Sequence, residues 1–485
     1  GLTVDLGELL SAARRQWGDD APAAAAGTGT SGIELGSVDV TGIAYDSRRV
    51  VAGDLFCCLP GSRADGHDHA AGAVEAGASA LLVERELDLG VPRILVPNAR
   101  RAMGLLASQL HGRPSQRLQA VGVTGTNGKT SVVHLLSDIL RQAGRRVAES
   151  GTLTGERTTP EAPDLQASLA SWAAEGVEVV CMEVSSHALA QHRVDGTDFA
   201  VVAHTNLSRD HLDYHGTMGA YAAAKQRLLT PEFSRQAVVM VEADGAGRDR
   251  VASARAAGLE VVALEAGDAP DWRGAPLDLP LPGRFAAHNA MVAAELALCL
   301  GVAEEEVRAA LARVAPVPGR FESLPQVDGV RVVVDYAHTP EALASVLSTA
   351  REVAGDGRVL CVFGCGGGRD RGKRAEMGRA ADEGADIVVV TSDNPRDEPP
   401  EGVIADILVG MERERAGAPG GEWTLLVEPD RRAAIAAAID RARPGDLVLV
   451  AGKGHERTQE VAGEHLPFDD SEVAGELLAN RDPGR

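Results

Sequence analysis

The chain has 485 residues, enough for roughly two to four domains, and 44% of them are apolar, although only 3% are aromatic. The formal net charge of −22 argues against nucleic acid or an anionic membrane as a partner, because both favour a basic surface. We find no secretory signal pattern and no apolar run of about 18 residues, so we expect a cytoplasmic protein that does not span a membrane. The six cysteines match no disulfide or zinc pattern and are expected to be buried free thiols.

The first predicted domain comprises residues 1–112, in which short strands and helices alternate. Residues 20–32 are rich in alanine, glycine and threonine, and this low complexity predicts a surface loop. Residues 111–116 are polar and contain glycine and proline, which predicts a linker to the next domain.

The second predicted domain comprises residues 113–318 and opens with a strand–turn–helix pattern. The strand is predicted at 118–123, and apolar residues at helical spacing predict a helix over 130–140. Continuous apolar runs of this kind are typical of a parallel sheet covered on both faces. Further strands are predicted at 177–182, 199–203, 237–241 and 259–264.

The third predicted domain comprises residues 319–485 and follows a boundary near 316–319. Its strands are predicted at 330–334, 359–363, 387–391, 424–427 and 447–450. Four of them run directly into the polar or glycine-rich segments 335–338, 364–370, 392–396 and 451–456. Ligands bind at the carboxyl ends of strands in open α/β sheets, so we expect these segments to converge. The fold class is therefore α/β, with a central P-loop ATPase-like parallel sheet and a Rossmann-like C-terminal domain.

Residues 122–131, GVTGTNGKTS, follow a strand and open a helix, as a phosphate-binding loop requires. Backbone N–H groups would surround phosphates, Lys129 would reach the β- and γ-phosphates, and Thr130 would ligate Mg²⁺. Val123 stands where the strict pattern has glycine, so this is a variant loop. A purely structural glycine turn is the alternative. The residues assigned to ATP are Gly125, Thr126, Asn127, Gly128, Lys129, Thr130 and Ser131.

The variant TGTNGKT resembles the ATP loop of the Mur ligase superfamily, which also contains folylpolyglutamate synthetase. Other segments resemble that family in the same order, namely 182–187 (MEVSSH), 204–215 (HTNLSRDHLDYH), 335–340 (DYAHTP) and 392–396 (SDNPR). The resemblance covers nearly the whole chain. It implies an ATP-dependent, ADP-forming ligase of peptidoglycan synthesis that adds meso-diaminopimelate to the D-Glu of UDP-N-acetylmuramoyl-L-Ala-D-Glu through an acyl phosphate.

The resemblance also implies a magnesium centre at Thr130, Glu183, His211 and Lys225. Lys225 matches the family lysine that is N-carboxylated, and Lys129, Lys225 and His211 are the implied catalytic residues. From the residues alone, Glu183 ends a predicted strand, and Mg²⁺ prefers a few oxygen ligands. No three-histidine spacing supports zinc. Asp213 and His215 are interpreted as capping residues.

The remaining implied ligands fall into three groups. Asn289, Arg320 and Asp335 resemble positions on the nucleotide side, and Ser47, Thr158, Thr159, Ser185, Gln191 and Arg193 resemble positions that hold the UDP-sugar peptide. Arg157 stands where asparagine is expected, which leaves its role open. The amino-acid group is Arg369, Asp393, Asn394, Pro395, Arg396, Gly452 and Glu456. Diaminopimelate has two zwitterionic centres that need arginine and acidic oxygens, whereas a second arginine would repel the distal ammonium of lysine. A plain Asn-Pro turn is the alternative for 393–396.

Several other functions stay open at this stage. Within the family, a lysine-adding ligase or a folylpolyglutamate synthetase would use the same loop. Outside it, the candidates are a P-loop switch or transport ATPase and a non-catalytic scaffold. The expected partners are UDP-N-acetylmuramoyl-dipeptide and meso-diaminopimelate, with ATP and Mg²⁺ and without nucleic acid or membrane. The oligomeric state is left open, with a monomer as the expectation.

Overall fold

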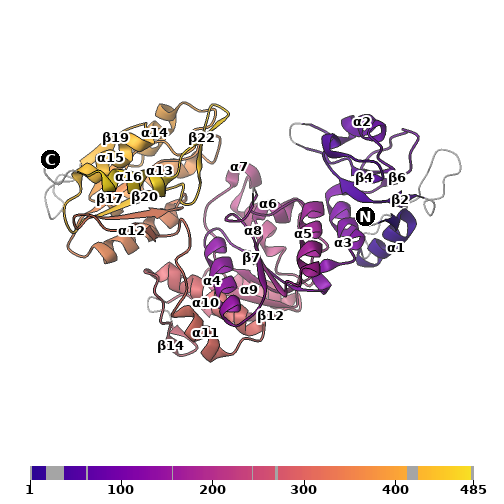
Figure 1. Ribbon diagram of the computed structural model, residues 1–485, viewed down its shortest axis with the longest axis horizontal. Helices are drawn as coiled ribbons and strands as arrows, with labels where there is room; N and C mark the ends of the chain where they lie inside the picture. Colours follow the sequence, from indigo (N-terminus) through magenta and orange to yellow (C-terminus); the bar gives the residue numbers. More distant parts are fainter. Residues whose placement is uncertain are drawn as a thin grey trace.

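The computed structural model describes residues 3–17, 38–61, 64–155, 157–242, 244–267, 271–411 and 424–481, so the predicted loop at 20–32 lies outside the described residues. Three lobes follow one another along the chain, and the central lobe lies between the other two (Figure 1). Each lobe contains one of the three larger sheets, which have four strands in the N-terminal lobe and six in each of the other two. Among the described residues, no helix is both long and apolar enough to cross a membrane.

The N-terminal domain is a four-stranded parallel sheet covered by helices. Its strands, in spatial order, are β3 (Gly42–Ala44), β4 (Asp54–Cys57), β5 (Ala80–Val83) and β6 (Arg93–Leu95). Side chains alternate across β4, so Leu55 packs with α1 (Leu6–Trp17) and α3 (Ala99–Leu110), whereas Phe56 packs with α2 (Ala70–Glu75). Helix α3 also contacts the central domain through α5 (Ala162–Ala174), so this domain is joined to the next by packing.

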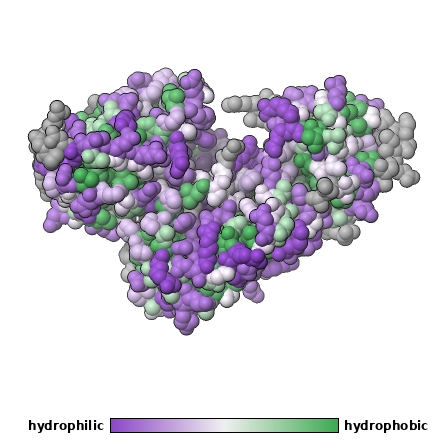
Figure 2. Space-filling model, in the orientation of Figure 1, coloured by the Kyte–Doolittle hydropathy of each residue, from purple (hydrophilic) through white to green (hydrophobic). Residues whose placement is uncertain are grey.

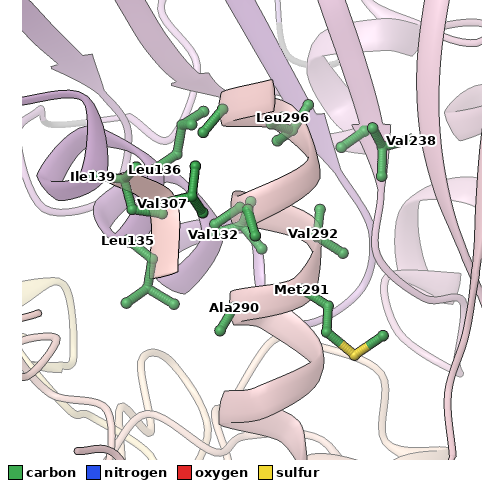
Figure 3. Close-up of a cluster of buried hydrophobic side chains, with 14 of the residues drawn as sticks. Val132, Leu135, Leu136, Ile139, Val238, Ala290, Met291, Val292, Leu296 and Val307 are labelled. Carbon is green, nitrogen blue, oxygen red and sulfur yellow. The ribbon is translucent and has the colours of Figure 1, made fainter. Parts of the chain in front are cut away.

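The central domain is built on a six-stranded parallel sheet with helices on both faces. The strand order is β12 (Glu260–Glu265), β11 (Gln236–Val241), β10 (Phe199–His204), β7 (Gln119–Thr124), β9 (Val179–Glu183) and β8 (Val147–Ser150). One face packs against α4 (Lys129–Gln142), α10 (Arg284–Cys299) and α11 (Glu304–Leu311). Figure 3 shows Leu136 and Ile139 of α4 beside Val307 of α11. The apolar residues whose spacing predicts α4 therefore form a stripe that packs this helix into the core. The packed helix in turn anchors the phosphate loop.

The C-terminal domain contains five parallel strands and one antiparallel edge strand. The order is β15 (Glu322–Ser323), β16 (Arg331–Asp335), β20 (Leu447–Ala451), β17 (Val359–Phe363), β18 (Ile387–Val390) and β19 (Thr424–Val427). Helices α12 (Pro340–Ala354), α13 (Gly372–Gly384) and α14 (Pro400–Leu408) cover one face, and α15 (Arg431–Arg441) and α16 (Asp470–Ala479) cover the other. Because β16, β20, β17 and β18 are neighbours, the four segments that follow them share one edge. The predicted convergence is confirmed.

Some sequence expectations need correction. Strand β8 was not predicted, because its four residues carry no apolar run. The predicted linker 111–116 is a packed segment, since Pro114 and Ser115 are buried and the Ser115 hydroxyl accepts a hydrogen bond from the Asp198 amide at 3.0 Å. The thiols of Cys57, Cys58, Cys181, Cys361 and Cys365 are buried and free as expected, whereas Cys299 is half-buried.

Candidate active site

The phosphate loop between β7 and α4 requires its glycines. Gly125 and Gly128 have φ values of 144° and 88°, a region that other residues rarely occupy. A Cβ on Gly125 would lie 1.8 Å from the Thr205 hydroxyl oxygen, and one on Gly128 would lie 2.4 Å from the Asn289 side-chain oxygen. The loop backbone is therefore pressed against β10 and α10, which places Asn289 beside the loop as expected.

Lys129 and Thr130 lie in the first turn of α4 and contact different groups. The Lys129 ammonium donates to the carbonyls of Gly125 at 2.8 Å and Thr126 at 2.9 Å. Burial lowers the pKa of Lys129. The Thr130 hydroxyl donates to Glu183 at 3.0 Å and accepts from Arg320 at 3.1 Å. The sequence-predicted residues Thr130, Glu183 and Arg320 thus meet at the helix N-terminus.

Lys225 lies directly behind the loop. It comes from α8 (Met218–Gln226), its side chain is 1% exposed, and its amine donates to the Gly125 carbonyl at 2.7 Å. Burial, with the charge of Lys129 as a second cause, lowers the pKa of Lys225 well below its usual value. Taken alone, the residue reads as an ordinary surface lysine, and this interpretation is wrong because α8 packs its last turn against the loop.

His211 lines the same cavity as the phosphate loop and has a left-handed backbone conformation, with φ 54°. Burial lowers its pKa to about 3, so its imidazole is neutral at pH 7 and offers a lone pair. Its Nε2 lies 3.3 Å from Asp210, which also lies 3.3 Å from the Lys373 ammonium of the C-terminal domain. Among the described residues, no group of three or more His, Cys, Asp or Glu side chains could hold a metal by itself. A centre with few protein ligands, completed by substrate oxygens, is what Mg²⁺ prefers.

Three cavities adjoin at this edge, where the molecule is hollowed between its outer domains (Figure 2). The central cleft, of about 1230 Å³, is lined by loop residues 126–130 and by Thr158, Glu183, Ser185, Arg193 and His211. The loop pocket, of about 1000 Å³, contains Ser131, Asn289, Arg320 and Asp335. The C-terminal pocket, of about 720 Å³, contains Arg369, Asp393, Asn394, Arg396, Gly452 and Glu456. Arg320 lines the first two cavities, and Arg369 lines the first and the third.

The wall of the central cleft next to the N-terminal domain is rich in arginine. Arg193, Arg157 and Arg100 lie 3.2, 2.8 and 3.3 Å from the buried carboxylate of Glu161. Three guanidinium groups around one carboxylate leave this wall positive, which suits an anionic ligand. Thr159 lines the cleft, but its hydroxyl is held by two backbone groups, donating to Glu183 at 2.9 Å and accepting from Ser185 at 3.1 Å.

The C-terminal pocket combines arginines with acidic oxygens. Arg396 donates to Glu460 at 3.0 Å and to the Gly367 carbonyl at 2.8 Å. Among the described residues, no partner holds Arg369, and its side chain is exposed at the mouth of the central cleft. Burial raises the pKa of Asp393. Its carboxylate lies so close to Gly452 that a Cβ there would come within 2.5 Å.

Asn394 and Glu456 are oriented by a residue that the sequence reasoning missed. The fully buried Lys453 donates to Asn394 at 3.2 Å and to Glu456 at 3.1 Å, and Asn394 donates to Glu456 at 2.9 Å. Lys453 lies within the predicted segment 451–456, so its place after a strand was the available signal. Pro395 is buried, with its carbonyl against Gly367, and shapes the backbone of the pocket.

Ser47 and Gln191, two of the predicted substrate ligands, line none of the three cavities. Ser47 begins a short 3-10 turn of the N-terminal domain, where the neighbouring Arg48 pairs with Asp46 at 2.7 Å. Gln191 stands behind the central cleft and accepts a hydrogen bond from Arg193 at 2.7 Å. The chain has four lysines in all, Lys129, Lys225, Lys373 and Lys453, and each lies at or directly behind these cavities. Arginine supplies the other basic side chains.

A phosphate loop lies at the carboxyl edge of the central parallel sheet, in a site formed by the central and C-terminal domains. Together with the adjoining positive cleft and a pocket that combines arginines with acidic oxygens, it defines a nucleotide-dependent enzyme with two further substrates. Family models match the chain in three parts: "Mur ligase family, catalytic domain" over residues 39–111, "Mur ligase middle domain" over 123–297, and "Mur ligase, glutamate ligase domain" over 319–454. The chain belongs to the Mur ligase family.

Named relatives extend over nearly the whole chain. The UDP-N-acetylmuramoyl-L-alanyl-D-glutamate–2,6-diaminopimelate ligase of Syntrophomonas wolfei is 42% identical over 91% of this chain and 95% of its own length. The enzyme of that name from Chromobacterium violaceum is 42% identical over 89% and 93%. A solved structure of a ligase of that name superposes with a TM-score of 0.66 at 31% identity, covering 98% of this chain and 99% of the other.

Proposed function

We propose that the protein is an ATP-dependent ligase that joins meso-diaminopimelate to the D-Glu carboxyl of UDP-N-acetylmuramoyl-L-Ala-D-Glu, with release of ADP and phosphate. The observation that carries the proposal is the pairing of two pockets through Arg369, which lines both the phosphate-loop cleft and the C-terminal pocket. An activated carboxyl formed in the first would face an amine bound in the second. The names of relatives more than 40% identical to the chain support the same substrates. Because both nucleotide substrates are cytoplasmic metabolites, we place the reaction in the cytoplasm.

The first proposed step is transfer of the γ-phosphoryl group to the D-Glu carboxylate. A carboxylate oxygen forms a bond to phosphorus while the bond to the β-phosphate oxygen breaks, giving an acyl phosphate and ADP. Phosphoryl transfer needs positioning and charge stabilisation more than covalent help from the protein. Lys129 and the loop N–H groups would hold the nucleotide phosphates, and Arg193 would hold the anionic substrate in the cleft.

The second proposed step joins the amino acid. The neutral amine of diaminopimelate attacks the acyl carbon, the carbon–oxygen bond to phosphate breaks, and the nitrogen loses a proton to give the amide. Arg369 and Arg396 would hold carboxylates, while Asp393 and Glu456 would accept hydrogen bonds from ammonium groups. This set favours diaminopimelate over lysine, whose distal end carries no carboxylate for the second arginine to bind.

Mg²⁺ fits the residues around Thr130. We propose that Thr130, Glu183, His211 and a carboxylated Lys225 hold it together with nucleotide oxygens; the ion would neutralise phosphate charge. A neutral, buried amine is the form of lysine that adds to CO₂, forming a nitrogen–carbon bond and releasing a proton. The lowered pKa of Lys225 supports this modification. The carbamate would add the anionic oxygens that this small ligand set needs.

The direct test is ADP release from the purified protein with UDP-N-acetylmuramoyl-L-Ala-D-Glu and, in turn, meso-diaminopimelate, lysine or glutamate. We expect turnover with diaminopimelate, and mass spectrometry should find the tripeptide product. Comparable turnover with lysine would favour the lysine-adding alternative. ADP release without any amino acid or nucleotide sugar would instead indicate a P-loop ATPase and refute the ligase.

A further inference from the structure

Asp195 lies at the junction of three functional elements, outside the cavities themselves. It follows the cleft residue Arg193 by two positions, its side chain is fully buried, and both its oxygens accept hydrogen bonds from Arg227 at 2.7 Å. Arg227 caps the end of α8, two residues after Lys225, and also donates to the Leu189 carbonyl at 2.6 Å. The carboxylate therefore ties the helix that carries Lys225 to the loop that carries Arg193.

The same carboxylate is linked to the N-terminal domain. His192 lies 2.8 Å from Asp195 through Nδ1 and 3.1 Å from the Asn98 amide through Nε2. The matching tautomer is neutral, with Nδ1–H donating to Asp195 and Nε2 accepting from Asn98. Asn98 caps α3 by accepting from the Arg101 amide at 3.0 Å. The chain of contacts thus runs from the start of α3 to the end of α8.

Close backbone packing reinforces this junction. A Cβ on Gly104 of α3 would lie 2.8 Å from the Asp195 carbonyl oxygen, and one on Gly196 would lie 2.8 Å from the Gly104 carbonyl oxygen. The Ser108 hydroxyl donates to the Gly196 carbonyl at 2.7 Å. Movement of α3 would therefore be transmitted directly to the turn that holds Asp195.

We propose that Asp195 is a positioning residue that couples the seating of the nucleotide-sugar substrate, through Asn98, His192 and Arg193, to the placement of carboxylated Lys225, through Arg227. The proposal rests on the proposed function and assigns each arm of the network its own kinetic effect. The substrate arm should govern the KM for the nucleotide sugar, and the helix arm should govern kcat. Misplacement of a reacting group by about 1 Å can cost about 100-fold in rate, so small shifts of α8 are enough.

The test separates the two arms by substitution. Asn98→Ser retains an N-cap oxygen but cannot reach His192, and it should raise the KM for the nucleotide sugar about tenfold with little change in kcat. Arg227→Gln should lower kcat about 10- to 100-fold with unchanged KM values, and Arg227→Lys should recover part of that loss. Asp195→Asn should show both effects. Asp198→Asn, which removes a carboxylate paired with Arg113 at 3.1 Å on the linker side, is the matched control.

A second readout reports on Lys225 without turnover. With ¹³C-bicarbonate, wild type should give a carbamate signal that disappears in Lys225→Ala, and the chain's four lysines make its assignment simple. Arg227→Gln and Asp195→Asn should weaken the signal, and added bicarbonate should raise their kcat but not that of wild type. No Lys225-dependent signal in wild type, equal signals in all variants, or the same parameter changed by both arms would overturn the proposal. Wild type that carries the carbamate but makes no tripeptide would refute the proposed function instead.

Discussion

The phosphate loop and the C-terminal pocket differ in the sequence separation of the residues whose hydrogen bonds hold each of them in shape. Lys129 bonds to carbonyls three and four residues away within one strand–loop–helix unit. In the C-terminal pocket, Asn394 bonds to Glu456, 62 residues away, and Arg396 bonds to Glu460, 64 residues away. The Lys129 contacts are therefore local and a short motif specifies them, whereas the pocket exists only because parallel strands bring distant segments to one edge.

The largest effect is expected in the phosphate loop. Lys129→Ala removes the charge placed on the transferring phosphoryl group, and ADP release should fall by about 100- to 1000-fold or below detection. Arg141→Ala, on the outer part of the same helix where Arg141 pairs with Glu149 at 2.7 Å, should leave turnover near wild type. Near-normal ADP release from the Lys129 variant would contradict the assignment of this loop as the nucleotide-binding site.

Lys225 combines the two kinds of contact, because it touches the phosphate loop but belongs to a helix 100 residues away along the chain. Lys225→Ala should lower kcat by about 100-fold, and acetate or propionate should restore part of it by placing a carboxylate in the vacated space. Gln226→Ala, one position on, should be close to wild type. If short-chain acids also rescued Lys129→Ala, the recovery would not report on a missing carbamate.

A smaller and more selective effect is expected in the C-terminal pocket. Arg396→Ala should raise the KM for diaminopimelate about 10- to 100-fold, because a charge-assisted hydrogen bond contributes about 1.5–3 kcal/mol. The KM for ATP should not change, and the preference over lysine should shrink; Arg369→Ala should behave alike. Arg432→Ala, at an exposed pair with Glu476, serves as the control in steady-state kinetics. A defect confined to ATP would contradict the assignment of this pocket to the amino acid.

The smallest effect concerns the stability of the C-terminal domain at acid pH, through the contacts of Glu398 beside the C-terminal pocket. Glu398 bonds to the fully buried Arg374 at 2.8 Å and to the Gly368 amide at 2.6 Å. The Arg374 hydrogen bond, followed by the Gly368 amide, lowers the pKa of Glu398 from 4.5 to about 2. A carboxylate with a depressed folded-state pKa stabilises the fold above its unfolded pKa, so this contribution is complete above about pH 4.5 and disappears towards pH 2.

Glu398→Gln should therefore lower the free energy of unfolding by about 1–2 kcal/mol at pH 7, and the difference from wild type should narrow as the pH falls from 4.5 to 2. Urea unfolding at several pH values measures it. Glu401→Gln, in the first turn of α14, is the control. A difference that stayed constant with pH would show that the Arg374–Glu398 pair does not account for the loss.

Much of the fold followed from local patterns. Apolar runs predicted the strands of the two larger sheets except β8 and the short edge strand β15, and the position of polar segments after β16, β17, β18 and β20 predicted that these segments would converge on one pocket. The resemblance implied residue roles that spacing could not indicate, including those proposed for Lys225 and His211. The sequence did not indicate the contacts of Lys453, Glu460 and Asp195, because their partners lie in distant segments that belong to no common motif.

The sequence by itself determined the phosphate loop, since positive-φ glycines, a strand and an amphipathic helix within one short stretch need no distant partner to be recognised. Tertiary structure alone decided which charges are buried and paired. Taken alone, Lys225 resembles a surface lysine, and its side chain is buried and its pKa lowered only because α8 packs behind the loop. Burial and opposite charge act through space, so the ionisation of a side chain is a property of the assembled domains and not of its neighbours along the chain.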